Sequence, residues 1–181
     1  MTREAMLLKK IEEGDLTCLD QLIACYYPDI FRYCLWHTDS RQTAEDAAQE
    51  TFLKFVRYFD RRVYGKKLRA YLYKIALNVC IDLSKRPHTD QLPEELSIGE
   101  PGYEHAENEE DFLQLVRQLP KEQQNLVILR FGQDLTMREC AEITGLPLRT
   151  VQSRLRSALK KIKKSDRSSE IMGGATGRSN P

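Results

Sequence analysis

The chain has 181 residues, of which 41% are hydrophobic, enough for one domain or two small ones with buried cores. Its 28 Lys and Arg residues nearly balance its 27 Asp and Glu residues, so the formal net charge is only +1. The sequence contains no apolar run as long as a membrane span and no signal-peptide pattern at its start. These features argue against a membrane-inserted or exported chain and predict a cytoplasmic one.

The charges are distributed unevenly along the chain. No Lys or Arg lies between Arg86 and Arg117, and the same interval is rich in Asp and Glu. Residues 88–108 also contain prolines and glycines and lack helical periodicity, which is typical of a flexible linker. Helical periodicity on both sides predicts an all-α chain with two small helical domains at 1–87 and 109–164, an acidic linker at 88–108 and a disordered tail at 165–181.

The first domain is predicted to contain several amphipathic helices. Gly14 is expected to end the first helix, Asp15 to cap the second, and Pro28 to kink or restart that second helix. The later helices are expected over Arg41–Phe59 and Leu68–Lys85.

The third predicted helix has two distinct faces. Its buried side should carry Ala48, Phe52, Phe55, Val56 and Phe59. On its other side Asp46, Gln49 and Glu50 are spaced i, i+3 and i+4 and form a compact polar surface. The spacing alone favours an ordinary solvated helix face.

A basic loop, DRRVYGKK, joins this helix to the next one. The loop supplies Tyr64, Lys66 and Lys67, and one face of the following helix carries Tyr71, Lys74, Asn78, Asp82 and Lys85. Tyrosines interleaved with cations suit single-stranded nucleic acid, whose bases stack on rings while its phosphates attract cations. A plain surface with helix-packing tyrosines is an equal alternative.

The stretch LTMRECAEITGLPLRTVQSRLRSALKKIKK predicts a helix-turn-helix. Thr136 and Glu139 form a capping-box pattern, and Gly145 suits the left-handed residue of a tight turn. The second helix should bury one stripe and expose a basic face that can enter a major groove. The predicted stripe is Leu148, Val151, Leu155, Leu159 and Ile162, and the opposite face carries Arg149, Ser153, Arg156 and Lys160, flanked by Gln152 and Arg154.

The five cysteines are odd in number and scattered through apolar patterns, so they are expected to be reduced. Cys34 and His37 lie one helical turn apart and could form half of a metal site, but no second close pair completes four ligands. No metal, cofactor or catalytic arrangement is therefore predicted, with a metal or redox sensor at Cys34 and His37 as the alternative.

Four stretches together resemble the extracytoplasmic-function sigma factors of bacterial RNA polymerase. These are GDLTCLDQLIACYYPDIFRYC, AEDAAQETFLKF, LRAYLYKIALNVCIDLSKR and the second-domain stretch that begins LPKEQQNLVILRF and ends with the helix-turn-helix. They occur in the family's order across the linker, and the resemblance covers roughly residues 14–164.

The resemblance implies a non-enzymatic subunit that binds polymerase core and promoter DNA and is held inactive by an anti-sigma factor. It assigns core binding to Asp46, Gln49, Glu50 and Phe52, which revises the solvated-face interpretation. It assigns binding of the unpaired non-template strand of the promoter's minus-10 element to Tyr64, Lys66, Lys67, Tyr71, Lys74, Asn78 and Lys85. It assigns the minus-35 element to Arg149, Thr150, Gln152, Ser153, Arg156 and Lys160.

Some positions depart from the family's pattern. Tyr71 stands where many relatives have tryptophan, Arg149 where glycine is common, and Gln152 where lysine is common. These changes touch the expected reading surfaces, so the promoter sequence is not transferable from relatives. An autonomous helix-turn-helix regulator and a polymerase-binding regulator that does not start transcription remain as alternatives.

Overall fold

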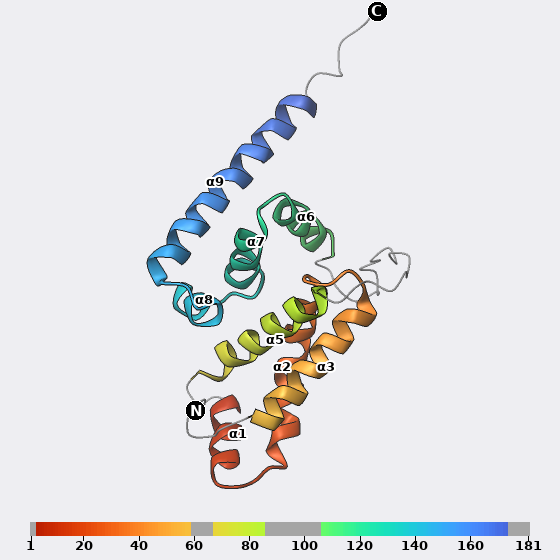
Figure 1. Ribbon diagram of the computed structural model, residues 1–181, viewed down its shortest axis with the longest axis vertical. Helices are drawn as coiled ribbons and strands as arrows, with labels where there is room; N and C mark the ends of the chain where they lie inside the picture. Colours follow the sequence, from red (N-terminus) through yellow and green to blue (C-terminus); the bar gives the residue numbers. More distant parts are fainter. Residues whose placement is uncertain (1–2, 59–66, 86–105, 174–181) are drawn as a thin grey trace, which may run out of the picture. The chain divides into compact units, whose positions relative to one another are not determined.

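A computed structural model describes residues 3–58, 67–85 and 106–173 of the chain. This described part is helical and contains no strand, and it divides into two compact units (Figure 1). One unit holds the helices from α1 to α5, and the other holds α6, α7, η1, α9 and most of α8. The prediction of an all-α chain with two helical domains is confirmed.

The first unit is built from α1 (Arg3–Glu12), α2 (Cys18–Leu35), α3 (Arg41–Tyr58) and α5 (Leu68–Ser84). Helices α2, α3 and α5 pack against one another, and α1 packs against α2 (Figure 1). The rings of Tyr33 and Tyr73 join α2 to α5 in an edge-to-face contact with centroids 5.3 Å apart. Both tyrosines are fully buried, so this contact lies within the core.

Alanines on α3 allow the helices of this unit to approach closely. Ala44, Ala47 and Ala48 are each 0% exposed, while Phe52 and Phe55 fill the space further along the same face. Small side chains bring helix backbones together, and the larger rings then exclude water from the remaining volume. This face of α3 anchors the whole first unit.

The start of α2 differs from the sequence prediction. Asp15 accepts hydrogen bonds from the backbone amide and the hydroxyl of Thr17, and these bonds lower the pKa of its carboxyl. The helix itself begins at Cys18, so Asp15 stabilises the preceding turn and is not the capping residue. Of the two outcomes expected at Pro28, a kink or a restart of the helix, the restart is wrong, because α2 continues as one helix through this residue. A proline costs a helix one hydrogen bond, and the buried stripe that includes Tyr26 and Ile30 offsets this cost.

The second unit contains α6 (Ala106–Arg117), α7 (Lys121–Val127), the π-helical turn η1 (Ile128–Gly132), α8 (Met137–Thr144) and α9 (Leu148–Gly173). Helix α6 already includes residues 106–108, so the linker predicted over 88–108 is too long at its end. Residues 86–105 lie outside the described part. Helix α7 runs directly into η1 and contacts both α6 and α9. The largest fully buried side chains of this unit are Leu126, Leu129, Leu135 and Leu155.

Both signals of the helix-turn-helix are confirmed. The Thr136 hydroxyl accepts a hydrogen bond from the Glu139 amide at 3.2 Å, and the Thr136 amide donates to the Glu139 carboxylate at 2.7 Å. Gly145 ends α8 with φ of 71°, in the left-handed region, and its amide donates to the Ala141 carbonyl. The turn therefore follows from a cap and a glycine that the sequence supplies locally.

Helix α9 differs from its prediction at two positions of the apolar stripe and at its C-terminal end. Val151, Leu155 and Ala158 are buried, but Leu148 and Leu159 are 36% and 38% exposed, respectively. The helix also continues to Gly173, so a disordered tail beginning at Ser165 is wrong for residues 165–173. No proline or glycine interrupts the sequence between Leu148 and Met172, which leaves no strong local signal to stop the helix. Residues 174–181 lie outside the described part.

The left-handed turn at Gly145 gives a stability prediction. Gly145→Ala should lower the free energy of unfolding by about 1 kcal/mol, because a side chain is disfavoured at this φ. No atom lies within 4 Å of an added Cβ, so the cost is conformational and not a clash. Urea denaturation followed by circular dichroism measures it. Gly145→Asn should cost less, since asparagine tolerates this region, and equal losses for both variants would contradict the explanation.

Candidate nucleic-acid and protein interfaces

The polar face of α3 is accessible, as predicted, but Phe52, which the family resemblance assigned to core binding with it, is buried on the other side of the helix, as its spacing predicted. Asp46, Gln49 and Glu50 are all exposed. Phe52 is only 6% exposed, and its ring stacks on Tyr27 with centroids 5.8 Å apart. The assignment of Phe52 to a polymerase-binding surface is therefore wrong, because its side chain is part of the core.

Two apolar side chains take the place of Phe52 on the exposed face. Leu53 is 66% exposed, and Val56 is 47% exposed although the sequence analysis expected it to be buried. Both residues follow Asp46, Gln49 and Glu50 at helical spacing. We call these residues the α3 stripe: Asp46, Gln49, Glu50, Leu53 and Val56. Helical periodicity could have placed Leu53 on this face, because it lies seven residues after Asp46 and three after Glu50.

Neighbouring side chains on α3 steady the acidic part of the stripe. The Gln42 amide donates to the Asp46 carboxylate at 3.4 Å. The Lys54 ammonium lies 3.7 Å from the Glu50 carboxylate, in an i, i+4 ion pair. Exposed pairs of this kind contribute little to stability, about 0.3–0.5 kcal/mol, so they leave the carboxylates available to a partner.

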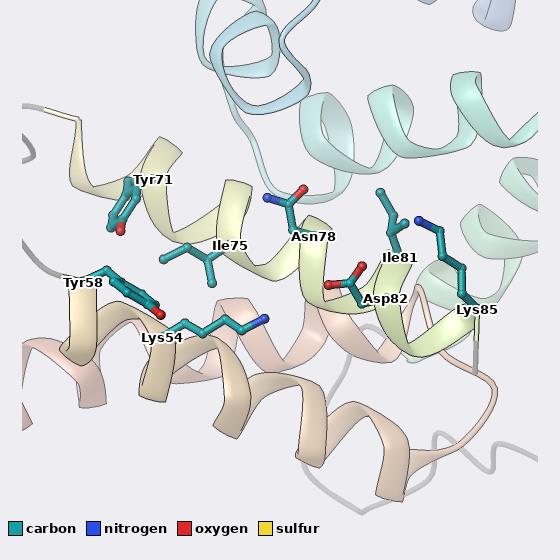
Figure 2. A pocket seen from close by; sticks show the side chains of 8 residues that line it. All are labelled: Lys54, Tyr58, Tyr71, Ile75, Asn78, Ile81, Asp82 and Lys85. Carbon is teal, nitrogen blue, oxygen red and sulfur yellow. The ribbon is translucent and has the colours of Figure 1, made fainter. Parts of the chain in front are cut away.

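A cleft of about 440 Å³ lies between α3 and α5 (Figure 2). Three of the residues assigned to the minus-10 strand line it, namely Tyr71, Asn78 and Lys85. Helix α3 forms the second wall, which was not predicted from the sequence. The other lining residues are Lys54, Tyr58, Ile75, Ile81 and Asp82.

The cleft combines rings, apolar side chains and cations. Figure 2 shows Tyr58 of α3 and Tyr71 of α5 at the same end of the cleft. Tyr71 is half-buried and its ring lies 6.4 Å from that of Phe55, which limits its movement. Lys54 and Lys85 bring positive charge from opposite helices. Such a cleft can hold a flat ring while cations contact an attached phosphate.

The other described minus-10 candidates do not line the cleft. Lys67 and Lys74 are exposed, but neither lines it. Tyr64 and Lys66 lie outside the described residues. The structure thus brings together three members of the predicted set.

The polar face of α9 is accessible along its length. The exposed residues on it are Arg149, Gln152, Ser153, Arg156 and Lys160. Thr150 is half-buried, and its amide donates to the Pro147 carbonyl at 2.9 Å in the turn that starts the helix. Thr150 therefore stands at the edge of this face.

A second group on α9 is already engaged within the unit. The Arg154 guanidinium lies 2.9 Å from the Glu122 carboxylate of α7. The Gln123 amide donates to the Ser157 hydroxyl at 3.4 Å. These contacts hold α9 on α7. Arg154 is therefore engaged within the unit, whereas Arg156 is exposed.

The chain matches the Sigma-70 region 2 family over residues 22–88 and the Sigma-70, region 4 family over residues 109–162. It belongs to the extracytoplasmic-function sigma factors. ECF RNA polymerase sigma factor SigW of Bacillus subtilis is 24% identical over 174 residues, which cover 85% of this chain and 93% of SigW. ECF RNA polymerase sigma factor BldN of Streptomyces coelicolor is 30% identical over 152 residues, or 77% of this chain and 56% of BldN.

A solved structure shares the fold of this sigma factor. The sigma factor RpoE in complex with the anti-sigma factor NepR from Bartonella quintana gives a TM-score of 0.60 at 18% identity, covering 81% of this chain and 94% of RpoE. As a member of the family, the chain is a promoter-recognition subunit of bacterial RNA polymerase and not an enzyme. None of its described helices is both long enough and apolar enough to span a bilayer.

The cysteines of this sigma factor have different environments. Cys18, Cys34, Cys80 and Cys140 are buried, and Cys25 is exposed. The Cys34 thiol makes a hydrogen bond with Cys80, and this bond together with burial raises the pKa of Cys34. The Nδ1 atom of His37 lies 2.8 Å from the Tyr33 carbonyl oxygen. In the described part of the chain, no three His, Cys, Asp or Glu side chains form a group that could hold a metal ion.

These environments predict which thiol reacts first. Iodoacetamide at about pH 8 should modify Cys25 more than about tenfold faster than Cys34 or Cys140, because a thiolate is the nucleophile and protonated thiols react slowly. Burial raises the pKa of Cys140 to about 11, so this thiol stays protonated well above neutral pH. Mass spectrometry of timed samples measures the order. Labelling in urea should remove the differences, and rapid modification of native Cys34 would refute the burial argument.

Proposed function

We propose that the two units of this sigma factor divide promoter recognition between them. The first unit docks on polymerase core through the α3 stripe and holds the unpaired minus-10 strand in the cleft between α3 and α5. The second unit reads the minus-35 element through the exposed face of α9. The proposed division is 1–87 for the first domain and the chain from the start of α6 onward for the second, with the segment between them as an acidic linker.

The cleft is the observation that carries this proposal. Tyr71, Asn78 and Lys85 were selected from the sequence for their residue types, and they line one hollow with Tyr58 and Lys54 of α3. Stacking of a base on an aromatic side chain contributes about 1–3 kcal/mol, and lysines favour the adjoining phosphates. Tyr64, Lys66, Lys67 and Lys74 are proposed as further contacts with the same strand.

The α3 stripe has the composition of a protein interface. Its apolar residues, Leu53 and Val56, are exposed beside a group of polar side chains. Interfaces commonly have an apolar centre and a polar rim that fixes register. Asp46, Gln49 and Glu50 supply that rim and would attract a basic partner surface on the polymerase.

The α9 face suits duplex DNA. Arg149, Gln152 and Ser153 lie in the first turns, from which side chains reach base edges when a recognition helix enters the major groove. Arg156 and Lys160 follow on the same face, where cations can contact phosphate. The Arg154–Glu122 ion pair helps to fix the helix that presents them.

The modest net charge of +1 fits a subunit that acts on the polymerase and not alone. Affinity for duplex DNA depends strongly on neutralised phosphates, so this chain should bind promoters weakly by itself. Held together on polymerase, two weak sites act at high effective concentration. A captured unpaired strand then favours the open promoter by differential affinity.

We also propose that the sigma factor acts in the cytoplasm and is restrained by an anti-sigma factor. The solved relative RpoE was crystallised with such a partner, NepR.

An autonomous helix-turn-helix regulator is the competing function. A gel-shift assay without polymerase distinguishes them, since the regulator would bind its duplex tightly and specifically alone. Run-off transcription with core enzyme tests the other alternative, because a regulator that binds polymerase without starting transcription would give no transcript.

The docking proposal predicts the effect of changing the centre of the α3 stripe. Leu53→Asp should weaken binding to polymerase core by about 5- to 100-fold, the usual range for losing a central interface side chain. Biolayer interferometry with immobilised core enzyme at fixed salt measures the change.

Met6→Asp is a matched control, because Met6 is an apolar residue of α1 that is 51% exposed and lies off the stripe. It should bind core as the unaltered chain does. If the two variants bound equally well, the docking surface would be misplaced.

The α9 proposal predicts a difference between two neighbouring arginines. Arg156→Ala should reduce initiation that depends on the minus-35 element by about tenfold and leave core binding unchanged, because it removes a contact to DNA only. It should also lower the slope of log affinity against log salt by about one if the contact is to phosphate.

Arg154→Ala is the control, since Arg154 is paired with Glu122. This variant should lose some stability but keep the salt slope. Run-off transcription on templates with and without the minus-35 element gives the comparison, and a loss of core association in Arg156→Ala would count against the assignment.

A further inference from the structure

Asp82 is out of place in a cleft that would bind only the backbone of a nucleic acid. Of the described side chains that line the cleft, it alone is acidic, and two of the others are lysines. A carboxylate repels phosphate, so it disfavours a strand that passes through with its backbone towards α5. It is compatible with a strand that turns a base towards α5 instead.

The surroundings of Asp82 favour a base over a phosphate. Asp82 lies on α5 one turn after Asn78, and Ile75 and Ile81 supply apolar surface nearby in the same cleft (Figure 2). Lys54 occupies the α3 side. Asp82 is exposed, and no described Lys, Arg or His pairs with it, so its carboxylate is available to a ligand.

We propose that Asp82 is a specificity-determining residue, which accepts a hydrogen bond from the amino group of one unpaired base and so disfavours thymine at that position. This inference rests on the proposed function of the cleft. It names a residue that the minus-10 assignment did not include and the chemical class of base that the residue selects.

Base chemistry gives the direction of the preference. An ionised carboxylate only accepts hydrogen bonds. Cytosine and adenine each present one exocyclic amino group, and guanine presents an amino group beside a ring N–H, which a carboxylate can accept together. Thymine has no amino group, and its single ring N–H lies between two carbonyl oxygens that repel a carboxylate. The Asn78 amide, with both donors and acceptors, can bind the rest of the base edge.

The test uses the complete sigma factor with polymerase core. Transcription start sites are first mapped on genomic DNA of the host, and the minus-10 segment of the strongest promoter is then randomised. Heparin-resistant open complexes formed on this library are sequenced for the unaltered chain, for Asp82→Asn and for Asp20→Asn. Asp20 is an exposed aspartate of α2 that does not line the cleft, so its variant controls for the change in net charge.

The expected result is one position at which the unaltered chain and Asp20→Asn disfavour thymine by about 5- to 100-fold. Asp82→Asn should reduce this discrimination to within about twofold, because its amide adds a donor for the thymine carbonyls, and should leave other positions unchanged. Identical base preferences in all three chains would overturn the inference about Asp82 and leave the proposed function of the cleft standing. The same conclusion would follow if Asp82→Asn formed fewer complexes in general without a change in base preference. If the unaltered holoenzyme started nowhere, the proposed function would fail and the inference with it.

Discussion

The packing of α3 against α2 and α5 is the constraint on which both surfaces of the first unit depend. Three alanines and two phenylalanines bury one face of this helix almost completely. Because a helix repeats every 3.6 residues, burying that face leaves the α3 stripe pointing outwards. The last turns of the same helix then supply Lys54 and Tyr58 to the cleft. One packed helix therefore positions a protein surface and a nucleic-acid surface together.

This arrangement makes the two surfaces neighbours along one rigid element. Glu50 belongs to the α3 stripe, and its ion-pair partner Lys54 lines the cleft. Docking on polymerase through the α3 stripe, as proposed, would take place one helical turn from the site proposed for the unpaired strand. The second unit follows the same design, because α9 is held on α7 by its apolar stripe and by the Arg154–Glu122 pair, which leaves its basic face accessible.

Features that depend on neighbouring residues in the chain could be predicted from the sequence. The capping box at Thr136 and the left-handed Gly145 are examples, since each is decided within a few residues. The helical faces of α3, α5 and α9 also followed from periodicity. The family resemblance added the roles of these faces, and membership of the family is established by the matches of both regions.

Features that depend on packing between helices could not be predicted in this way. Helical spacing placed both Phe52 and Val56 on the buried side of α3, and this is right for Phe52 but wrong for Val56, which is 47% exposed. The burial of Phe52 also contradicts the surface role that the family resemblance gave to this residue. The cleft was missed as a unit because its walls come from residues of α3 and α5 that are not consecutive in sequence. The tail from Ser165 was judged by its polar composition, although a helix without a stop signal can extend beyond its core.

The length of α9 has a geometric consequence for how the second unit can lie on a duplex. With 26 residues and a rise of about 1.5 Å per residue, α9 is about 39 Å long, longer than one repeat of B-DNA at about 34 Å. A rod of this length cannot follow a curving groove from end to end, so in the proposed complex the part of α9 beyond Lys164 would leave the groove. Inserting a single residue midway would turn that part by about 100° relative to Arg149 and change the side of the duplex on which it leaves.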